Sequence, residues 1–252
     1  MQFASLGSGS KGNSTLIRVG NTLVMVDCGF SVRETVRRMA RLCVDPSQID
    51  AILVTHEHSD HSSGVAALSR KFQIPVYLTH GTSSTGRCDD TFEQCLFDCE
   101  DDFSIGSLSV KAVAVPHDAM EPCQYRLSGG GRTLGILTDL GSITPHVIAN
   151  FHTCHGLLLE FNHDLPLLME GPYPPHLKER VGGDWGHLNN QQAVDLLAEI
   201  NHAEMRYLVV AHISERNNSR QLAEYALLSL LDSLDGVIFA DQRDGFDWLN
   251  LA

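Results

Sequence analysis

The sequence predicts an α/β protein, and the prediction rests on two patterns. In the first and last thirds of the chain, short apolar runs typical of strands alternate with segments of helical periodicity. The middle third, from Phe103 to Asp139, instead shows strand-like runs separated by turn signals such as Ser-Gly-Gly-Gly at 128–131, which favours antiparallel hairpins. With 252 residues and 43% hydrophobic residues, the chain is expected to form one domain over residues 1–252.

The expected elements follow in chain order from apolar periodicity and turn residues. Before the hairpins we expect strands at Ser14–Val19 and Thr22–Asp27, a helix near Val32–Arg41, a buried strand at Ala51–Thr55, a helix near Ser62–Phe72 and a strand at Val76–Thr79. After the hairpins we expect a helix near Pro145–Asn150, a strand at Gly156–Phe161, a helix near Asn190–Ile200, a strand at Tyr207–Ala211, a helix near Arg220–Leu231, and a closing strand pair at Gly236–Asp241 and Gly245–Leu249.

Composition narrows the cellular setting and the partners. Neither a basic, apolar leader nor a run of about 18 apolar residues occurs, so we expect a cytoplasmic protein that does not enter a membrane. The seven cysteines are odd in number and never spaced as Cys-x-x-Cys, which indicates buried thiols. Sequence-independent binding of nucleic acid normally depends on Lys and Arg that neutralise phosphates, and the net charge of −13 argues against such binding by basic residues alone. The one basic cluster has helical spacing and favours a solvated helix face over a phosphate track: Arg33, Arg37, Arg38 and Arg41.

The segment Thr55–His61, directly after the apolar run Ala51–Val54, contains four potential metal ligands. They are His56, His58, Asp60 and His61. A strand that runs into a loop can direct such side chains at one point, and the turn after His58 suits a second metal beside the first. A polar loop that happens to be rich in histidine is the alternative.

Three later residues repeat one arrangement, in which an apolar strand ends in a single His or Asp. They are His117, Asp139 and His212. Because strand ends meet at one edge of a sheet, we expect these side chains to join the first cluster and complete two metal sites. Each residue alone could instead serve a loop, a turn or a helix entry.

These motifs resemble the metallo-β-lactamase superfamily of dinuclear hydrolases. Further segments are similar to its YycJ/WalJ-like branch, which is related to tRNase Z and cyclic phosphodiesterases: Gly7–Ser14, Glu160–Asp164, Gly186–Asn190 and Ala211–Ser214. The resemblance implies a four-layer αββα sandwich of two mixed sheets with two divalent ions at one edge. Because the donors are imidazoles and carboxylates without a thiolate, zinc and manganese are favoured and iron is also possible.

The resemblance also distributes the ligands and the supporting residues. It assigns one metal to His56, His58 and His117 and the other to Asp60, His61 and His212, with Asp139 bridging. Asp27 would support a ligating imidazole from behind.

Further residues would serve the reaction. Asp60 would also orient the nucleophile, and His187, backed by Glu160, would protonate the leaving oxygen, with His163 as a phosphate contact or an alternative acid. Ser10 and Asn13 could face a phosphate, although a tight turn at their glycines is equally expected.

Three functions remain open at this level. A phosphodiesterase or nuclease acting on DNA or RNA through a metal-bridging hydroxide follows from the resemblance, which implies DNA exonuclease activity in the YycJ/WalJ-like branch. A glyoxalase-like thioester or lactone hydrolase would use the same metal site. A metal-bound scaffold without turnover is the third. The sequence does not indicate the oligomeric state.

Overall fold

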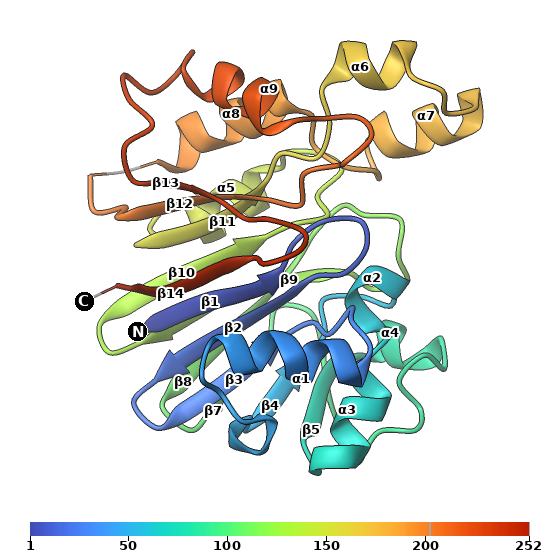
Figure 1. Ribbon diagram of the computed structural model, residues 1–252, viewed down its shortest axis with the longest axis vertical. Coiled ribbons are helices and arrows are strands. Elements are labelled where there is room, and N and C mark those ends of the chain that lie inside the picture. The colour runs from blue at the N-terminus through green and yellow to red at the C-terminus, as the bar shows by residue number, and fades with distance from the viewer. Residues whose placement is uncertain (202, 252) are drawn as a thin grey trace.

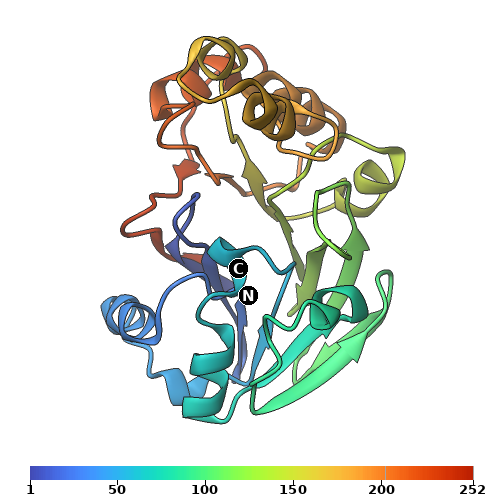
Figure 2. The ribbon, with the colours of Figure 1, turned by 90° about the vertical axis from the view of Figure 1, so that its right-hand side faces the viewer.

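The strands form two mixed sheets, which lie face to face with helices on their outer sides (Figures 1 and 2). In the computed structural model, which describes residues 1–201 and 203–251, each sheet has seven strands. The first sheet has the spatial order β14 (Phe246–Asn250), β1 (Gln2–Gly7), β2 (Ser14–Val19), β3 (Thr22–Val26), β4 (Ala51–Leu53), β5 (Pro75–Thr79) and β6 (Glu93–Phe97). The second has the order β13 (Val237–Phe239), β12 (Tyr207–Ala211), β11 (Gly156–Glu160), β10 (Arg132–Leu137), β9 (Cys123–Gly129), β8 (Leu108–Ala114) and β7 (Asp102–Ile105).

The helices divide between the outer faces of the two sheets (Figure 1). Beside the first sheet lie α1 (Val32–Arg41), a short 3₁₀ helix (Pro46–Gln48), α2 (Ser59–Ser62), α3 (Val65–Phe72) and α4 (His80–Ser84). Beside the second lie α5 (Pro145–Phe151), α6 (Leu165–Glu170), α7 (Pro175–Gly182), α8 (Asn190–Ile200) and α9 (Arg220–Leu227). None of the helices formed by residues 1–201 and 203–251 has the length and apolarity needed to cross a membrane.

Successive side chains of a strand point to opposite faces of its sheet. The central strands are buried on both faces, one against the other sheet and one against helices, and this arrangement produces four layers. In β3, Val24 and Val26 join the cluster between the sheets, whereas Leu23 and Met25 face the cluster that includes residues of α1 and α3. In β11, Leu158 faces the other sheet. Leu157 and Leu159, on the opposite face of β11, belong to a cluster that includes residues of α5, α8 and α9. The expected αββα sandwich is therefore confirmed.

The hairpins expected in the middle third are also confirmed. Strands β7, β8, β9 and β10 pair antiparallel in succession, and β10, β11, β12 and β13 then run parallel. The parallel register sets Leu137 beside Leu159, and Glu160 beside Ala211. The carboxyl ends of β10, β11 and β12 therefore meet at one edge of the sheet, as ligand sites in such sheets require.

Several expectations need correction. The closing strands are not a pair: β13 joins the second sheet and β14 the first, and only an isolated bridge from Asp241 to Gly245 links the segments. The helix expected to begin near Ser62 begins at Val65 instead, and a separate short helix, α2, precedes it. The helix expected to extend to Leu231 ends at Leu227. Strands β1 and β6 and helices α4, α6 and α7 were not expected. Strand β6 is a half-exposed edge strand and α7 has no buried residue, so neither carries an amphipathic pattern.

Candidate metal centre

The candidate ligands lie where strands end, at the right-hand edge of the molecule in Figure 1. Val54 and Thr55 connect β4 to His56, Thr138 connects β10 to Asp139, and His212 directly follows β12. Asp27, Asp139 and His212 all have φ between 53° and 59°, a left-handed conformation that is uncommon for residues other than glycine. Three of the six described non-glycine residues with positive φ thus lie at the candidate site, where the surrounding structure can hold this conformation in place.

The first group consists of His56, His58 and His117, whose ligand atoms all lie within 4.8 Å of one another. The Nε2 atom of His117 lies 3.2 Å from Nδ1 of His58. Two nitrogens bound to one tetrahedral zinc ion would be about 3.3 Å apart. The buried Nε2 of His56 has no hydrogen-bond partner among the described residues, which an ion would supply. The group therefore has the donor chemistry and spacing of a metal site.

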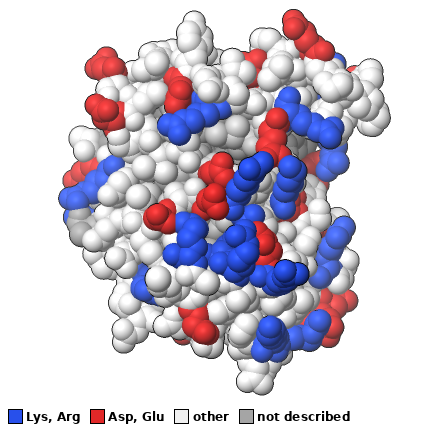
Figure 3. Space-filling model, in the orientation of Figure 1, with Lys and Arg blue, Asp and Glu red and all other residues white. Residues whose placement is uncertain are grey.

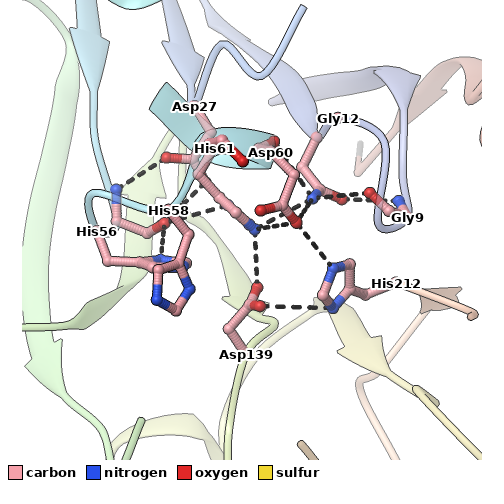
Figure 4. A network of polar contacts seen from close by, with 12 residues as sticks. Gly9, Gly12, Asp27, His56, His58, Asp60, His61, Asp139 and His212 are labelled. Carbon is pink, nitrogen blue, oxygen red and sulfur yellow. Dashed lines mark hydrogen bonds and ion pairs between the residues drawn. The ribbon is translucent and has the colours of Figure 1, made fainter. Parts of the chain in front are cut away.

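The second group consists of Asp60, His61 and His212, and Asp139 lies beside it (Figure 4). The Nε2 atom of His61 lies 3.4 Å from Oδ2 of Asp60 and 3.1 Å from Oδ2 of Asp139. The other oxygen of Asp139 lies 3.9 Å from Nε2 of His117 in the first group. Asp139 thus lies between the two groups, as a bridging ligand must.

Buried hydrogen bonds orient the imidazoles from behind. Nδ1 of His61 lies 2.8 Å from a carboxylate oxygen of Asp27, and Nδ1 of His117 lies 2.9 Å from the carbonyl oxygen of Gly186. Asp27 itself accepts hydrogen bonds from the backbone N–H and the hydroxyl of Thr55. A proton fixed on Nδ1 leaves Nε2 free to bind a metal, so Asp27 has the geometry expected for its supporting role.

The loop that carries Asp60 packs closely against the glycine-rich opening. The carbonyl oxygen of Asp60 accepts a 2.7 Å hydrogen bond from the backbone of Asn13, and a Cβ at Gly29 would lie 1.8 Å from the same oxygen. Gly9 and Gly12 adopt φ of 146° and 148°, and the N–H of Gly12 donates to the carbonyl of Gly9. The opening therefore forms the tight turn that was one of the two expectations.

Charge interactions shift the pKa values of the ligands strongly. Burial disfavours the charged form of His212, but the carboxylates of Asp139, Asp60 and Glu160 outweigh it and raise the pKa to about 10. Burial likewise opposes a charge on His61, whose pKa the neighbouring carboxylates raise well above its usual value. Burial and nearby histidines lower the pKa of His56. A site with this much excess carboxylate is built to hold positive charge.

Glu160, at the end of β11, connects the candidate ligand His212 to His187. One of its oxygens lies 3.2 Å from Nδ1 of His187 and 3.3 Å from Nδ1 of His212, and the other accepts from the N–H groups of Leu140 and Leu188. Burial alone would raise the pKa of Glu160, but the adjacent imidazoles lower it to about 2. His187 also lies near enough to Asp139 and His212 for the three to ligate an ion.

Of the remaining expected site residues, some line a cavity beside the candidate ligands and others do not. Ser10 and His187 line a cavity of about 370 Å³ above the ligands. The side-chain amide of Asn13 lies 3.4 Å from Oδ2 of Asp60 and 3.1 Å from Nε2 of His61, so Asn13 contacts ligands rather than the cavity. His163 is fully buried and is not part of the cavity lining. Its expected role as a phosphate contact or alternative acid stays a prediction.

Sequence reasoning missed four charged residues of the same cavity: Glu57, Arg87, Asp118 and Arg180. Asp118 directly follows His117 in the sequence, and this adjacency was the available signal. Arg87 and Arg180 belong to segments whose structure was not expected, so no pattern in the sequence placed them near the candidate ligands.

Comparisons with known proteins agree with this geometry. The family description "Beta-lactamase superfamily domain" matches residues 22–213. Exodeoxyribonuclease WalJ of Streptococcus pneumoniae serotype 2 is 30% identical over 241 residues, covering 93% of this chain and 89% of that protein. Exodeoxyribonuclease YycJ of Bacillus anthracis is 31% identical over 237 residues, covering 92% and 89%. The crystal structure of the metallo-beta-lactamase fold protein YhfI from Bacillus subtilis aligns with a TM-score of 0.77 at 16% identity, over 99% of both chains.

Proposed function

Because this chain belongs to the β-lactamase superfamily, we propose that it is a metal-dependent phosphodiesterase that acts as a nuclease, with DNA as the substrate and exonuclease cleavage as the mode. The observation that carries the proposal is the pair of Glu160 and His187, 3.2 Å apart beside the ligand cluster. A general acid backed by a carboxylate suits a poor leaving group such as a deoxyribose oxygen, which needs a proton as it departs. The two relatives that match over most of their length are both named exodeoxyribonucleases.

Seven residues would hold two divalent cations, zinc or manganese by preference and iron as a further option. They are His56, His58, Asp60, His61, His117, Asp139 and His212. The bound pair would lower the pKa of a shared water and neutralise the non-bridging oxygens of a phosphodiester. Imidazole and carboxylate donors without a thiolate fit these ions.

Four side chains would orient the attacking water and protonate the leaving oxygen. Asp60 and Asp139 would hold the metals and orient the attacking water, and an oxygen of each lies within 3.4 Å of Nε2 of His61. Glu160 holds Nδ1 of His187, so Nε2 is the nitrogen that can donate a proton to the leaving oxygen. A proton held there can be transferred without diffusion from solvent, which contributes roughly 10²- to 10⁴-fold in rate.

A comparison of substrates with and without chelator tests the proposal. We expect the metal-loaded protein to cleave bis(p-nitrophenyl) phosphate and DNA, and EDTA to abolish both activities. Double-stranded and single-stranded DNA are tested in parallel with S-lactoylglutathione, which a thioester hydrolase would prefer. Turnover of the thioester alone would refute the nuclease proposal, and turnover of nothing by a fully metal-loaded protein would favour a scaffold.

A further inference from the structure

The cavity above the metal ligands has two arginines in its wall. Arg87 follows α4, and Arg180 belongs to α7, so they come from elements beside the first and the second sheet. Both elements lie at the ligand edge of the molecule (Figure 1). The cavity volume of about 370 Å³ exceeds what a single phosphate group needs and leaves room for a neighbouring group of the substrate.

Arg180 is held over the first ligand group by Asp118. Its Nε donates to one oxygen of Asp118, whose other oxygen lies 3.5 Å from Nε2 of His117 and 3.9 Å from Nε2 of His58. The Arg180 side chain is nevertheless 58% exposed, so the rest of its guanidinium group remains open to a ligand. A guanidinium presents several N–H donors in a planar fork that matches phosphate oxygens.

Charge in the cavity explains how an acidic chain could receive a polyanion. Four carboxylates line the cavity against the two arginines, which leaves a formal excess of two negative charges: Glu57, Asp60, Asp118 and Asp139. Two divalent cations would reverse this to an excess of two positive charges. The arginines would then act in a locally positive cavity although the chain carries a net charge of −13.

The other concentration of basic side chains is already engaged within the protein. Figure 3 shows Lys and Arg gathered over the face that carries α1. There Arg37 and Arg38 pair with Glu34, and Arg41 pairs with Asp247. Arg38 also donates to the carbonyl oxygens of Leu6 and Gln242. These contacts fit a helix-packing role better than a path for phosphates.

We infer that Arg87 and Arg180 bind a phosphate next to the one that is cleaved, so that the site prefers chains of consecutive phosphodiesters to an isolated phosphodiester. The inference rests on the proposed function and adds its substrate preference. Leu177 and Val181, also in the cavity wall, would contact apolar parts of the same nucleotide. Arg87 and Arg180 are binding residues in this scheme, and neither takes part in bond breaking.

The test compares Arg87→Gln and Arg180→Gln with Arg70→Gln. Arg70 is a matched control for Arg180 because both are partly exposed, ion-paired arginines, and Arg70, which is bound to Asp90, lies outside the cavity lining. Substrates are bis(p-nitrophenyl) phosphate, the dinucleotide TpT and a thymidine decamer. Each cavity variant should lower kcat/KM for the decamer about tenfold, as expected for the loss of a hydrogen bond to a charged group. It should change the two single-phosphate substrates less than about twofold.

Binding supplies a readout that does not depend on turnover. Fluorescence anisotropy with a phosphorothioate decamer should show weaker binding by each cavity variant and a salt dependence reduced by about 0.7 per lost contact in log–log slope. Zinc content should equal that of the wild type.

Equal losses on all three substrates, or losses no larger than those of Arg70→Gln, would overturn the inference while leaving the function intact. If the wild type cleaves no phosphodiester at all, it is the proposed function that fails.

Discussion

Asp27→Asn offers the sharpest test of how the second ligand group is built. Asparagine has the shape of aspartate and tolerates the left-handed conformation of this position, where φ is 59°, so the backbone should not change. Its oxygen can still accept from the N–H of Thr55, as Oδ1 of Asp27 does. Its amide group, however, would face Nδ1 of His61, which lies 2.8 Å from Oδ2 in the wild type.

Two N–H donors cannot share one hydrogen bond, so His61 must either lose the contact or move its proton to Nε2, the nitrogen that binds the metal. Loss of a buried hydrogen bond to a charged group costs about 1.5–3 kcal/mol, and each 1.4 kcal/mol is a factor of ten in affinity. We therefore expect the affinity of the second site to fall by about tenfold to hundredfold, the range found when such supporting residues are lost. The site formed by His56, His58 and His117 should keep its affinity.

Competition with a chromophoric zinc chelator measures both affinities and the stoichiometry. The wild type should bind two zinc ions tightly, and Asp27→Asn should bind one tightly and one weakly. The thermal midpoint of the metal-free variant serves as the control for folding. If both ions bind as tightly as in the wild type, or if both weaken equally, Asp27 does not act through His61 and the reasoning is wrong.

Three further predictions concern the same centre. Asp139→Ala should lower the metal content from near two per chain and abolish turnover, and full occupancy measured by elemental analysis would show that Asp139 is not a bridge. His187→Ala should retain both metals but slow cleavage of DNA about 10²- to 10⁴-fold and cleavage of a nitrophenyl ester far less, so equal slowing would remove it as the acid. The raised pKa values of His212, about 10, and His61 mean that both carry protons at neutral pH before metal binds. Binding should therefore release about two protons and tighten as pH rises, and calorimetry that gives the same heat in buffers of different ionisation enthalpy would contradict this.

Much of the site could be predicted from the sequence because its ligands follow a simple rule. Apolar strands are recognisable from their composition, and the polar residue that ends each one must lie at the sheet edge. His56, Asp139 and His212 were found in this way, and the structure brings them to one place. The resemblance to a family then supplied the division into two metal sites, which spacing alone did not give.

The arginines of the cavity wall could not be predicted, because they do not follow recognisable apolar strands. Helix α7 has no buried residue and its few apolar residues do not extend into a long stripe, so Arg180 looks like any surface arginine. Its position depends on tertiary contacts such as the ion pair with Asp118. The burial of His163 could likewise not be inferred from its place after β11.

The backbone geometry at Asp139 and His212 has an evolutionary consequence. A left-handed φ at these positions is most easily adopted by glycine, and other residues pay of order 1 kcal/mol or more for it. Selection for thermostability alone would thus reward glycine there and erase two ligands without disturbing the sheet. The chain nevertheless carries a carboxylate and an imidazole at these two corners, which is what metal binding, and not folding, would require of them.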